Sequence, residues 1–200
     1  MVNSYIGKNN MYKITSQIQK TYFINTTSRY VAEFSTGKRE QVFEYNGIST
    51  DKVDYAVLKI KFFEDTNFAN SINVKIKYND KEITAVLEKN PFDLSFMCDL
   101  KHLFKDNSIQ ILIENVDDEF VSLECVSTKW QINYEEALKI GFKALKNFIK
   151  QNQCECYLTV GYEKYNLETV YFWIFNVKAK NTSSKNVVIN VDDGEIVFVS

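Results

Sequence analysis

Short runs of alternating apolar and polar residues, with no long helix between them, constrain the fold of this chain more than any other feature. The runs are rich in Val, Ile, Phe and Tyr, which favour β-strands, and Asn, Asp, Gly and Ser clusters separate them. Asn79-Asp80 has the composition of a tight hairpin turn. The expected strands are Tyr22–Phe34, Glu40–Tyr45, Tyr55–Phe63, Ser71–Tyr78, Glu82–Leu87, Ser108–Glu114 and Glu119–Lys129.

Many short strands without crossover helices favour an antiparallel all-β arrangement. We therefore expect residues 21–130 to form an antiparallel β-sandwich of the jelly-roll kind. Residues 1–20 are expected to be an N-terminal extension.

The pattern changes after Ile132, where a helix is expected. Asn133 can cap it, and Glu136 lies at the spacing of a capping box. Four expected strands follow, at 155–163, 168–178, 186–191 and 195–199, and Asp193-Gly194 between the last two is a hairpin signal. Residues 131–200 are thus predicted to form a small α+β module of one helix and a four-stranded antiparallel sheet, and the chain as a whole is mainly β.

Composition limits the classes of partner. The chain has 24 basic and 26 acidic residues, a balance that argues against nucleic-acid binding. No apolar run approaches the roughly 18 residues of a membrane-spanning helix. The N-terminus has no apolar signal segment, so we expect a cytoplasmic protein whose four cysteines are reduced.

Two segments resemble known families. The first segment resembles a recurring piece of galactose-binding-like jelly rolls. It consists of Asp99-Leu100 through Leu103, the bend at Lys105-Asp106-Asn107 and the alternating Ile109, Ile111 and Ile113. Such folds often bind sugars, so this resemblance implies a carbohydrate as a candidate ligand, although the segment carries no sugar contacts.

The residues from Asn133 onward resemble PepSY-like domains and one group of immunity proteins from bacterial toxin systems. The matching residues are Tyr134 to Leu138, Tyr171 to Phe175, and Asp193-Gly194-Glu195-Ile196. This resemblance implies a non-catalytic, protein-binding role, but a widely shared fold does not fix a function.

The cysteines are the most conspicuous candidates for chemistry. On a strand, Cys154 and Cys156 share a face with Leu158 and Val160, which favours packing in the core. The alternative is a metal or redox site, for which the candidate ligands are Cys98, His102, Cys125, Cys154 and Cys156. No C-x-x-C pair supports that alternative.

No other motif points to catalysis or a cofactor. Two acidic clusters have the composition of turns: Asp117-Asp118-Glu119 and Asp192-Asp193. A calcium site at the first cluster and a catalytic pair of carboxylates stay open as alternatives. Phosphate-binding glycine motifs and a nucleophile elbow are absent from the sequence. We therefore predict no enzyme and no cofactor.

The stretch VYFWIFNVK, from Val170 to Lys178, is apolar on both faces of a strand. One helix covers only one face of a small sheet, so the other face needs the sandwich, a partner protein or a second copy as its cover. The candidate partner-binding residues are Tyr157, Tyr171, Trp173 and Phe175, with Tyr157 expected on the Trp173 face.

These observations favour a non-enzymatic binding protein that acts through protein–protein contacts, of the inhibitor or immunity type, or through homo-oligomerisation. The alternatives are a carbohydrate- or ligand-binding module and a structural subunit of a phage or secretion assembly.

Overall fold

The computed structural model describes residues 8–40, 52–64, 70–79, 81–93, 95–100, 108–165, 168–180 and 182–200. The helices are α1 (Lys8–Ile14), α2 (Tyr134–Ala144) and α3 (Lys146–Gln151), with a short 3₁₀ helix, η1 (Val126–Thr128). The strands are β1 (Thr15–Thr26), β2 (Tyr30–Glu40), β3 (Lys52–Phe62), β4 (Ser71–Tyr78), β5 (Lys81–Lys89), β6 (Phe96–Asp99), β7 (Ser108–Ile113), β8 (Val121–Cys125), β9 (Cys154–Tyr165), β10 (Glu168–Ala179), β11 (Lys185–Asn190) and β12 (Ile196–Val199).

The chain divides into two compact units that are not continuous in sequence. The first, here called the barrel unit, consists of Lys20–Gly37 and Asp54–Lys129. The second, here called the helical unit, consists of Met1–Gln19, Lys38–Val53 and Trp130–Ser200. Strand β1 therefore contributes its first residues to the helical unit and its later residues to the barrel unit.

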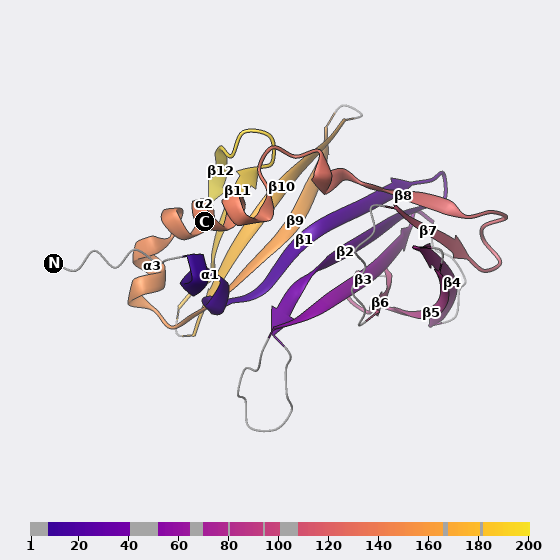
Figure 1. The fold of residues 1–200 in the computed structure, drawn as a ribbon, viewed down its shortest axis with the longest axis horizontal. Helices are drawn as coiled ribbons and strands as arrows, with labels where there is room; N and C mark the ends of the chain where they lie inside the picture. The colour runs from indigo at the N-terminus through magenta and orange to yellow at the C-terminus, as the bar shows by residue number, and fades with distance from the viewer. Residues whose placement is uncertain are drawn as a thin grey trace, which may run out of the picture. The chain divides into compact units, whose positions relative to one another are not determined.

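The barrel unit is a closed eight-stranded β-barrel (Figure 1). The strand order is β1-β2-β3-β6-β5-β4-β7-β8, and the pairings from β3 through β8 are antiparallel. Strand β8 then returns to β1, with Phe23 opposite Cys125 and Ile24 opposite Glu124. Closure removes the two free edges that an open sheet of the same strands would expose.

The barrel interior is filled by side chains. Alternate residues of each strand point inward, as in β4, where Ile72, Val74 and Ile76 are buried. Large aromatic residues join them, and Phe23 and Phe34 meet edge to face with ring centroids 5.7 Å apart. An eight-stranded barrel has an interior just wide enough for such packing, so the barrel unit has a solid core.

The predicted β-sandwich, or jelly roll, is wrong. The strand periodicity is the same in both architectures, but here β8 pairs with β1 and the sheet closes on itself. The expected strand at 22–34 is in fact the end of β1, a turn at residues 27–29 and the start of β2. Thr27 stabilises this turn, because its Oγ1 accepts hydrogen bonds from the backbone N–H groups of Arg29 and Tyr30, both at 3.1 Å.

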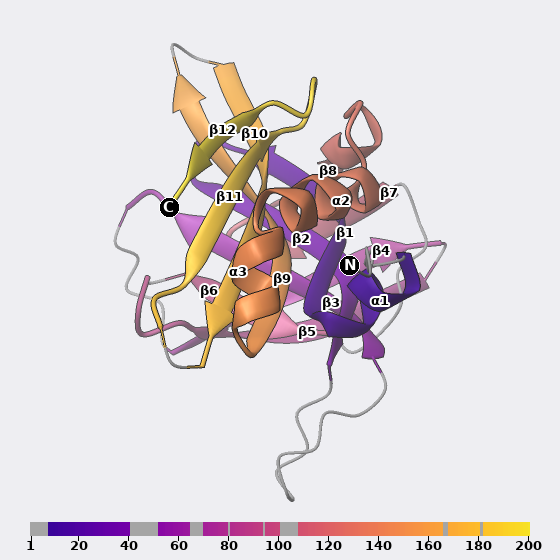
Figure 2. The same ribbon diagram turned by 90° about the vertical axis from the view of Figure 1, so that its left-hand side faces the viewer.

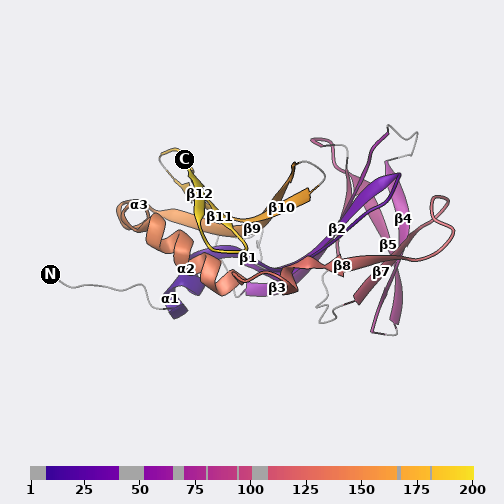
Figure 3. The same cartoon turned by 90° about the horizontal axis from the view of Figure 1, so that it is seen from above.

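The helical unit contains a sheet in the order β12-β11-β10-β9-β1. The pairings among β9 to β12 are antiparallel, whereas β1 adds to β9 in parallel, with Thr15 opposite Cys156. Helices α2 and α3 lie on one side of strands β9 to β12 (Figures 2 and 3). Asn133 caps α2 in a complete capping box with Glu136, as expected from the sequence.

The predicted self-contained module of one helix and four strands is also wrong. The helical segment breaks at Leu145, whose backbone leaves helical geometry, and continues as α3. The sheet gains β1 as a further, parallel strand, and β1 begins within the residues 1–20 that were expected to be an N-terminal extension. No helix in the described part of the chain is both long and apolar enough to cross a membrane.

A buried carboxylate ties the barrel's β7–β8 connection to β2. The Asp117 side chain is only 4% exposed and accepts hydrogen bonds from Tyr30 Oη and from the backbone N–H of Ile113, both at 2.8 Å. Arg29 lies 3.5 Å away and supplies a positive charge. Burial, with Asp117 next in importance, raises the pKa of Tyr30, so the tyrosine remains a hydrogen-bond donor.

Replacing Asp117 by Ala should destabilise the barrel by about 2–3 kcal/mol, because the Tyr30 hydroxyl and the Ile113 amide lose their acceptor. Asp118→Ala provides a matched control, since Asp118 is exposed and its loss should change the unfolding free energy by less than about 0.5 kcal/mol. Urea denaturation measures both. Equal effects of the two substitutions would contradict the role assigned to Asp117.

Candidate functional site

The cysteines lie in or against the two cores. Cys156 is fully buried in the helical unit beside Leu158, and Cys154 and Val160 pack against the same core, which confirms the predicted shared face. Burial raises the pKa of the Cys156 thiol to about 12 and that of Cys98 to about 11. A thiol with a raised pKa is a poor nucleophile and a poor metal ligand at neutral pH.

The described residues contain no group of three or more His, Cys, Asp and Glu side chains that could hold a metal ion. His102 lies outside the described residues, as does the whole bend at Lys105-Asp106-Asn107 that resembles galactose-binding-like folds. The alternative of a metal site formed by all five residues is therefore not tested as a whole.

The acidic clusters have structural partners. Asp117 Oδ2 accepts from Tyr30 and Ile113, and Oδ1 lies 3.5 Å from Arg29 Nη2, so both oxygens of this carboxylate already face donor groups and not a free cation site. In the second cluster, Asp193 accepts a hydrogen bond from the Glu195 backbone at 2.8 Å. This bond shapes the turn that leads into β12.

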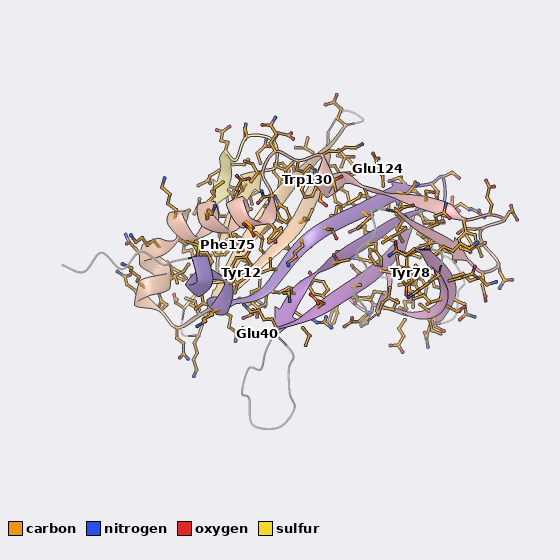
Figure 4. The ribbon with its side chains drawn as sticks, in the orientation of Figure 1. Tyr12, Glu40, Tyr78, Glu124, Trp130 and Phe175 are labelled. Atoms are coloured by element: carbon orange, nitrogen blue, oxygen red, sulfur yellow. The ribbon has the colours of Figure 1, made fainter. Side chains whose placement is uncertain are left out.

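Two of the predicted partner-binding residues are buried under α2. Trp173 is 1% exposed, donates from Nε1 to the Ile132 carbonyl at 2.7 Å, and meets Trp130 edge to face. Phe175 is fully buried, with its ring centroid 4.9 Å from that of Phe142 in α2; Figure 4 marks its place beside the helix. These aromatic rings form the core of the helical unit and present no surface to a partner.

Gly141 makes this close approach of α2 possible. A Cβ built on Gly141 would lie 2.4 Å from Cγ of Phe175, nearer than real side-chain atoms approach. The sequence places Gly141 at the point where α2 crosses Phe175, so the helix backbone packs directly against the Phe175 ring.

The two tyrosines of the prediction are half-buried and lie on opposite faces. Tyr171 is on the helix-covered face, with its ring centroid 5.5 Å from that of Trp130. Tyr157 pairs across the sheet with Asn176, so it lies on the other face, and its expected place on the Trp173 face is wrong. Leu158 occupies that face, because it is opposite Phe175.

The face away from α2 and α3 carries an apolar row that runs across three strands. Ile174 is opposite Val188, and Val188 is opposite Phe198, so the three side chains are neighbours on one face. We call these three residues the apolar row. Ile174 and Val188 are half-buried and lie outside the core cluster of the helical unit, and Phe198 is 56% exposed.

The row ends at β12, the last strand of the sheet. Most of the exposed large hydrophobic residues in the described chain are scattered singly, but four are consecutive: Ile196 at 40%, Val197 at 55%, Phe198 at 56% and Val199 at 49% exposure. The strand has neither a charge nor a proline to block association at a sheet edge, although it is only four residues long and its ladder with β11 shifts register between Val188 and Ile189. The sequence did not single out this strand, because IVFV resembles any buried strand until its position in the sheet is known.

A hydrogen-bonding pattern identifies which backbone groups β12 leaves unused. The Ser200 N–H donates to the Asn186 carbonyl at 3.1 Å, and Phe198 is the partner of Val188 two residues along. Ser200 is a hydrogen-bonded partner of Asn186, so the neighbouring Val199 directs its N–H and C=O groups away from β11, whereas the register shift between Val188 and Ile189 makes Val197 the extra residue of a bulge. We call this side of β12 the free edge.

A second surface feature lies in the barrel unit. An open cavity of about 630 Å³ is lined by the β4–β5 hairpin and the start of β7, including Tyr78, Ser108 and Gln110. The Nζ of Lys77 lies 3.5 Å from Glu82 and 3.7 Å from the Phe120 ring centroid. The residues that line the cavity are polar, and two of its charged groups, Lys77 and Glu82, form an ion pair.

Comparison of the chain with protein-family models, curated proteins and solved structures finds no match. The galactose-binding-like, PepSY-like and immunity-protein resemblances therefore remain predictions, and the site must be argued from its own geometry.

Trp173→Ala and Phe172→Ala test which face of β10 is core. Loss of buried Trp173 should lower the unfolding free energy by about 3–5 kcal/mol, whereas loss of half-exposed Phe172 should lower it by only about 1 kcal/mol. Chemical denaturation of both variants measures the difference. A Trp173→Ala protein as stable as Phe172→Ala would contradict the burial of this face.

The cysteine pKa values predict resistance to alkylation. At pH 8, only roughly one Cys156 side chain in ten thousand is a thiolate, so iodoacetamide should label it only after unfolding. The folded pKa lies above the unfolded value of 9.0, so the stability contributed by this neutral thiol is complete below pH 9 and is lost as the pH rises towards 12. Mass spectrometry locates the label; rapid labelling of Cys156 in the native protein would show that the thiol is accessible.

Proposed function

We propose that this chain is a non-enzymatic binding protein that recognises another polypeptide by strand addition at β12. The observation that carries the proposal is the run of four exposed apolar residues on a strand at the end of the sheet. Strand addition gives affinity through main-chain hydrogen bonds and specificity through alternate side chains. The free edge of β12 offers main-chain hydrogen-bonding groups, and the apolar row offers the side chains that would give specificity.

The surrounding structure supports a pre-formed site. Strand β11 holds β12 through three pairs of residues, and the Asn186 backbone N–H donates to Ser200 Oγ at 2.9 Å. The core under α2 fixes the other face of the same sheet. A bound strand would thus add to a rigid template and would lose little entropy in ordering the site.

An inhibitor or immunity-type role is the specific form that the resemblance of residues 133–200 implies. Strand addition suits such a role, since a bound segment of the partner is held in one extended conformation. The high thiol pKa values of Cys98 and Cys156 support the non-enzymatic part of the proposal, because neither thiol suits nucleophilic catalysis.

Carbohydrate binding is the second candidate, and the cavity beside the β4–β5 hairpin favours it. Tyr78 lines that cavity together with the amide and hydroxyl side chains of Gln110 and Ser108. Sugar recognition commonly combines an aromatic ring with such polar groups. We rank this candidate second because Lys77 and Glu82, which also line the cavity, form an ion pair with each other.

Site-specific photo-cross-linking in the protein's own cells tests the leading proposal. Benzoylphenylalanine in place of Phe198 should cross-link to a polypeptide, because the proposal puts a bound strand within contact of that side chain. The same substitution at Phe92, which is 95% exposed in the barrel unit, is the matched control. Mass spectrometry identifies the products.

Polypeptide adducts at position 198 that exceed those at position 92 would support strand addition. Equal yields at the two positions, or no adduct at position 198, would contradict it.

A further inference from the structure

Three carboxylates directly precede the exposed strand β12 and have no cationic partner. Asp192, Asp193 and Glu195 are all exposed, and none of them forms an ion pair with a residue in the described part of the chain. Resting on the proposed function, we infer that the polypeptide segment added at β12 is basic as well as apolar, with a Lys or Arg side chain placed against Glu195.

Glu195 lies on the same face of the sheet as the apolar row. Its neighbour Ile196 is opposite Ile189, which is buried on the helix-covered face, so Glu195 is directed to the other face. The Asn190 N–H donates to the Glu195 carbonyl at 2.9 Å, and Asn190 is itself opposite Phe172 on that other face. The carboxylate therefore lies at one end of the apolar surface that β12 presents.

The register of β11 sets the spacing between this charge and the apolar row. Phe198 is opposite Val188, and Glu195 lies beside Asn190, so the two side chains occupy positions two residues apart on β11. Two residues of extended strand span about 6.7 Å. The pairings on either side of the bulge at Val197 set this spacing, whatever the direction of the Val197 groups. A regular strand on the free edge meets Phe198 with one side chain and Glu195 with the side chain two residues along.

The two positions require different chemistry from the added segment. An apolar side chain suits the place beside Phe198, and a cationic side chain suits the place beside Glu195, because opposite charges in neighbouring strands attract and like charges repel. Asp192 and Asp193 add to the negative potential at this end of the strand. The same potential disfavours nucleic acid and an anionic lipid surface as occupants. The added segment thus has an apolar and a basic residue two positions apart.

Neutralising Glu195 tests this charge without disturbing the strand. Its side chain has no hydrogen bond or ion pair to any described residue, so Glu195→Gln should leave the melting temperature unchanged. In lysate of the protein's own cells at about 20 mM salt, full-length protein with benzoylphenylalanine in place of Phe198 should give about two- to five-fold less polypeptide adduct when it carries Glu195→Gln. Glu195→Lys should lower the yield further, because it places like charges together.

Glu163→Gln is the matched control. Glu163 is exposed and lies opposite Val170 on the same face of the sheet, but on β9, three strands away from β12. Its neutralisation should leave the adduct yield at position 198 unchanged. Mass spectrometry of the adduct then reads the captured segment, which should carry a Lys or Arg two residues from the cross-linked position.

A lower yield from the Glu195 substitutions alone, together with a basic residue at that spacing, would support the inference. A yield that Glu195→Gln and Glu195→Lys leave unchanged, an equal loss from Glu163→Gln, or a captured segment without Lys or Arg would overturn it and leave strand addition intact. The absence of any adduct at position 198 in the protein without these substitutions would overturn the proposed function, and the inference with it.

Discussion

The packing of α2 against one face of the β9–β12 sheet determines what the rest of the helical unit can do. Trp173 and Phe175 fill the space under the helix, and Gly141 lets the helix approach the sheet closely. Because strand side chains alternate, burial of these residues leaves Phe172 and Ile174 on the opposite face. The helix thus selects both the core and the surface, and the surface leads across β11 to the exposed strand β12.

Local features of the chain could be predicted from the sequence, but their closure into a barrel could not. Strands such as β4 and the capped start of α2 follow from periodicity and from Asn133 and Glu136, which act over a few residues. The pairing of Phe23 with Cys125 joins residues a hundred positions apart, and alternation is the same in an open sandwich and a closed barrel. The parallel pairing of β1 with β9 likewise cannot be predicted from the sequence of either strand alone.

In the candidate site, too, local patterns could be predicted from the sequence, whereas features that depend on strand pairing could not. The sequence correctly marks β10 as apolar on both faces, but Trp173 and Phe175 were assigned to a partner because composition does not say which face a helix covers. Tyr157 was placed on the wrong face for a related reason, since only the register with Asn176 fixes its side. The importance of Phe198 depends on its place at the end of the sheet, which is a property of topology and not of the four residues of β12.

The central claim is that the unused backbone groups of β12 bind another strand, and hydrogen exchange tests it most directly. The Val199 amide points to the free edge, so it should exchange quickly in the unbound protein and become protected when a partner polypeptide adds a strand. Amides within the closed barrel, such as that of Ile111, should not change. A Val199 amide whose exchange rate is unchanged in the complex with a captured polypeptide would contradict the account.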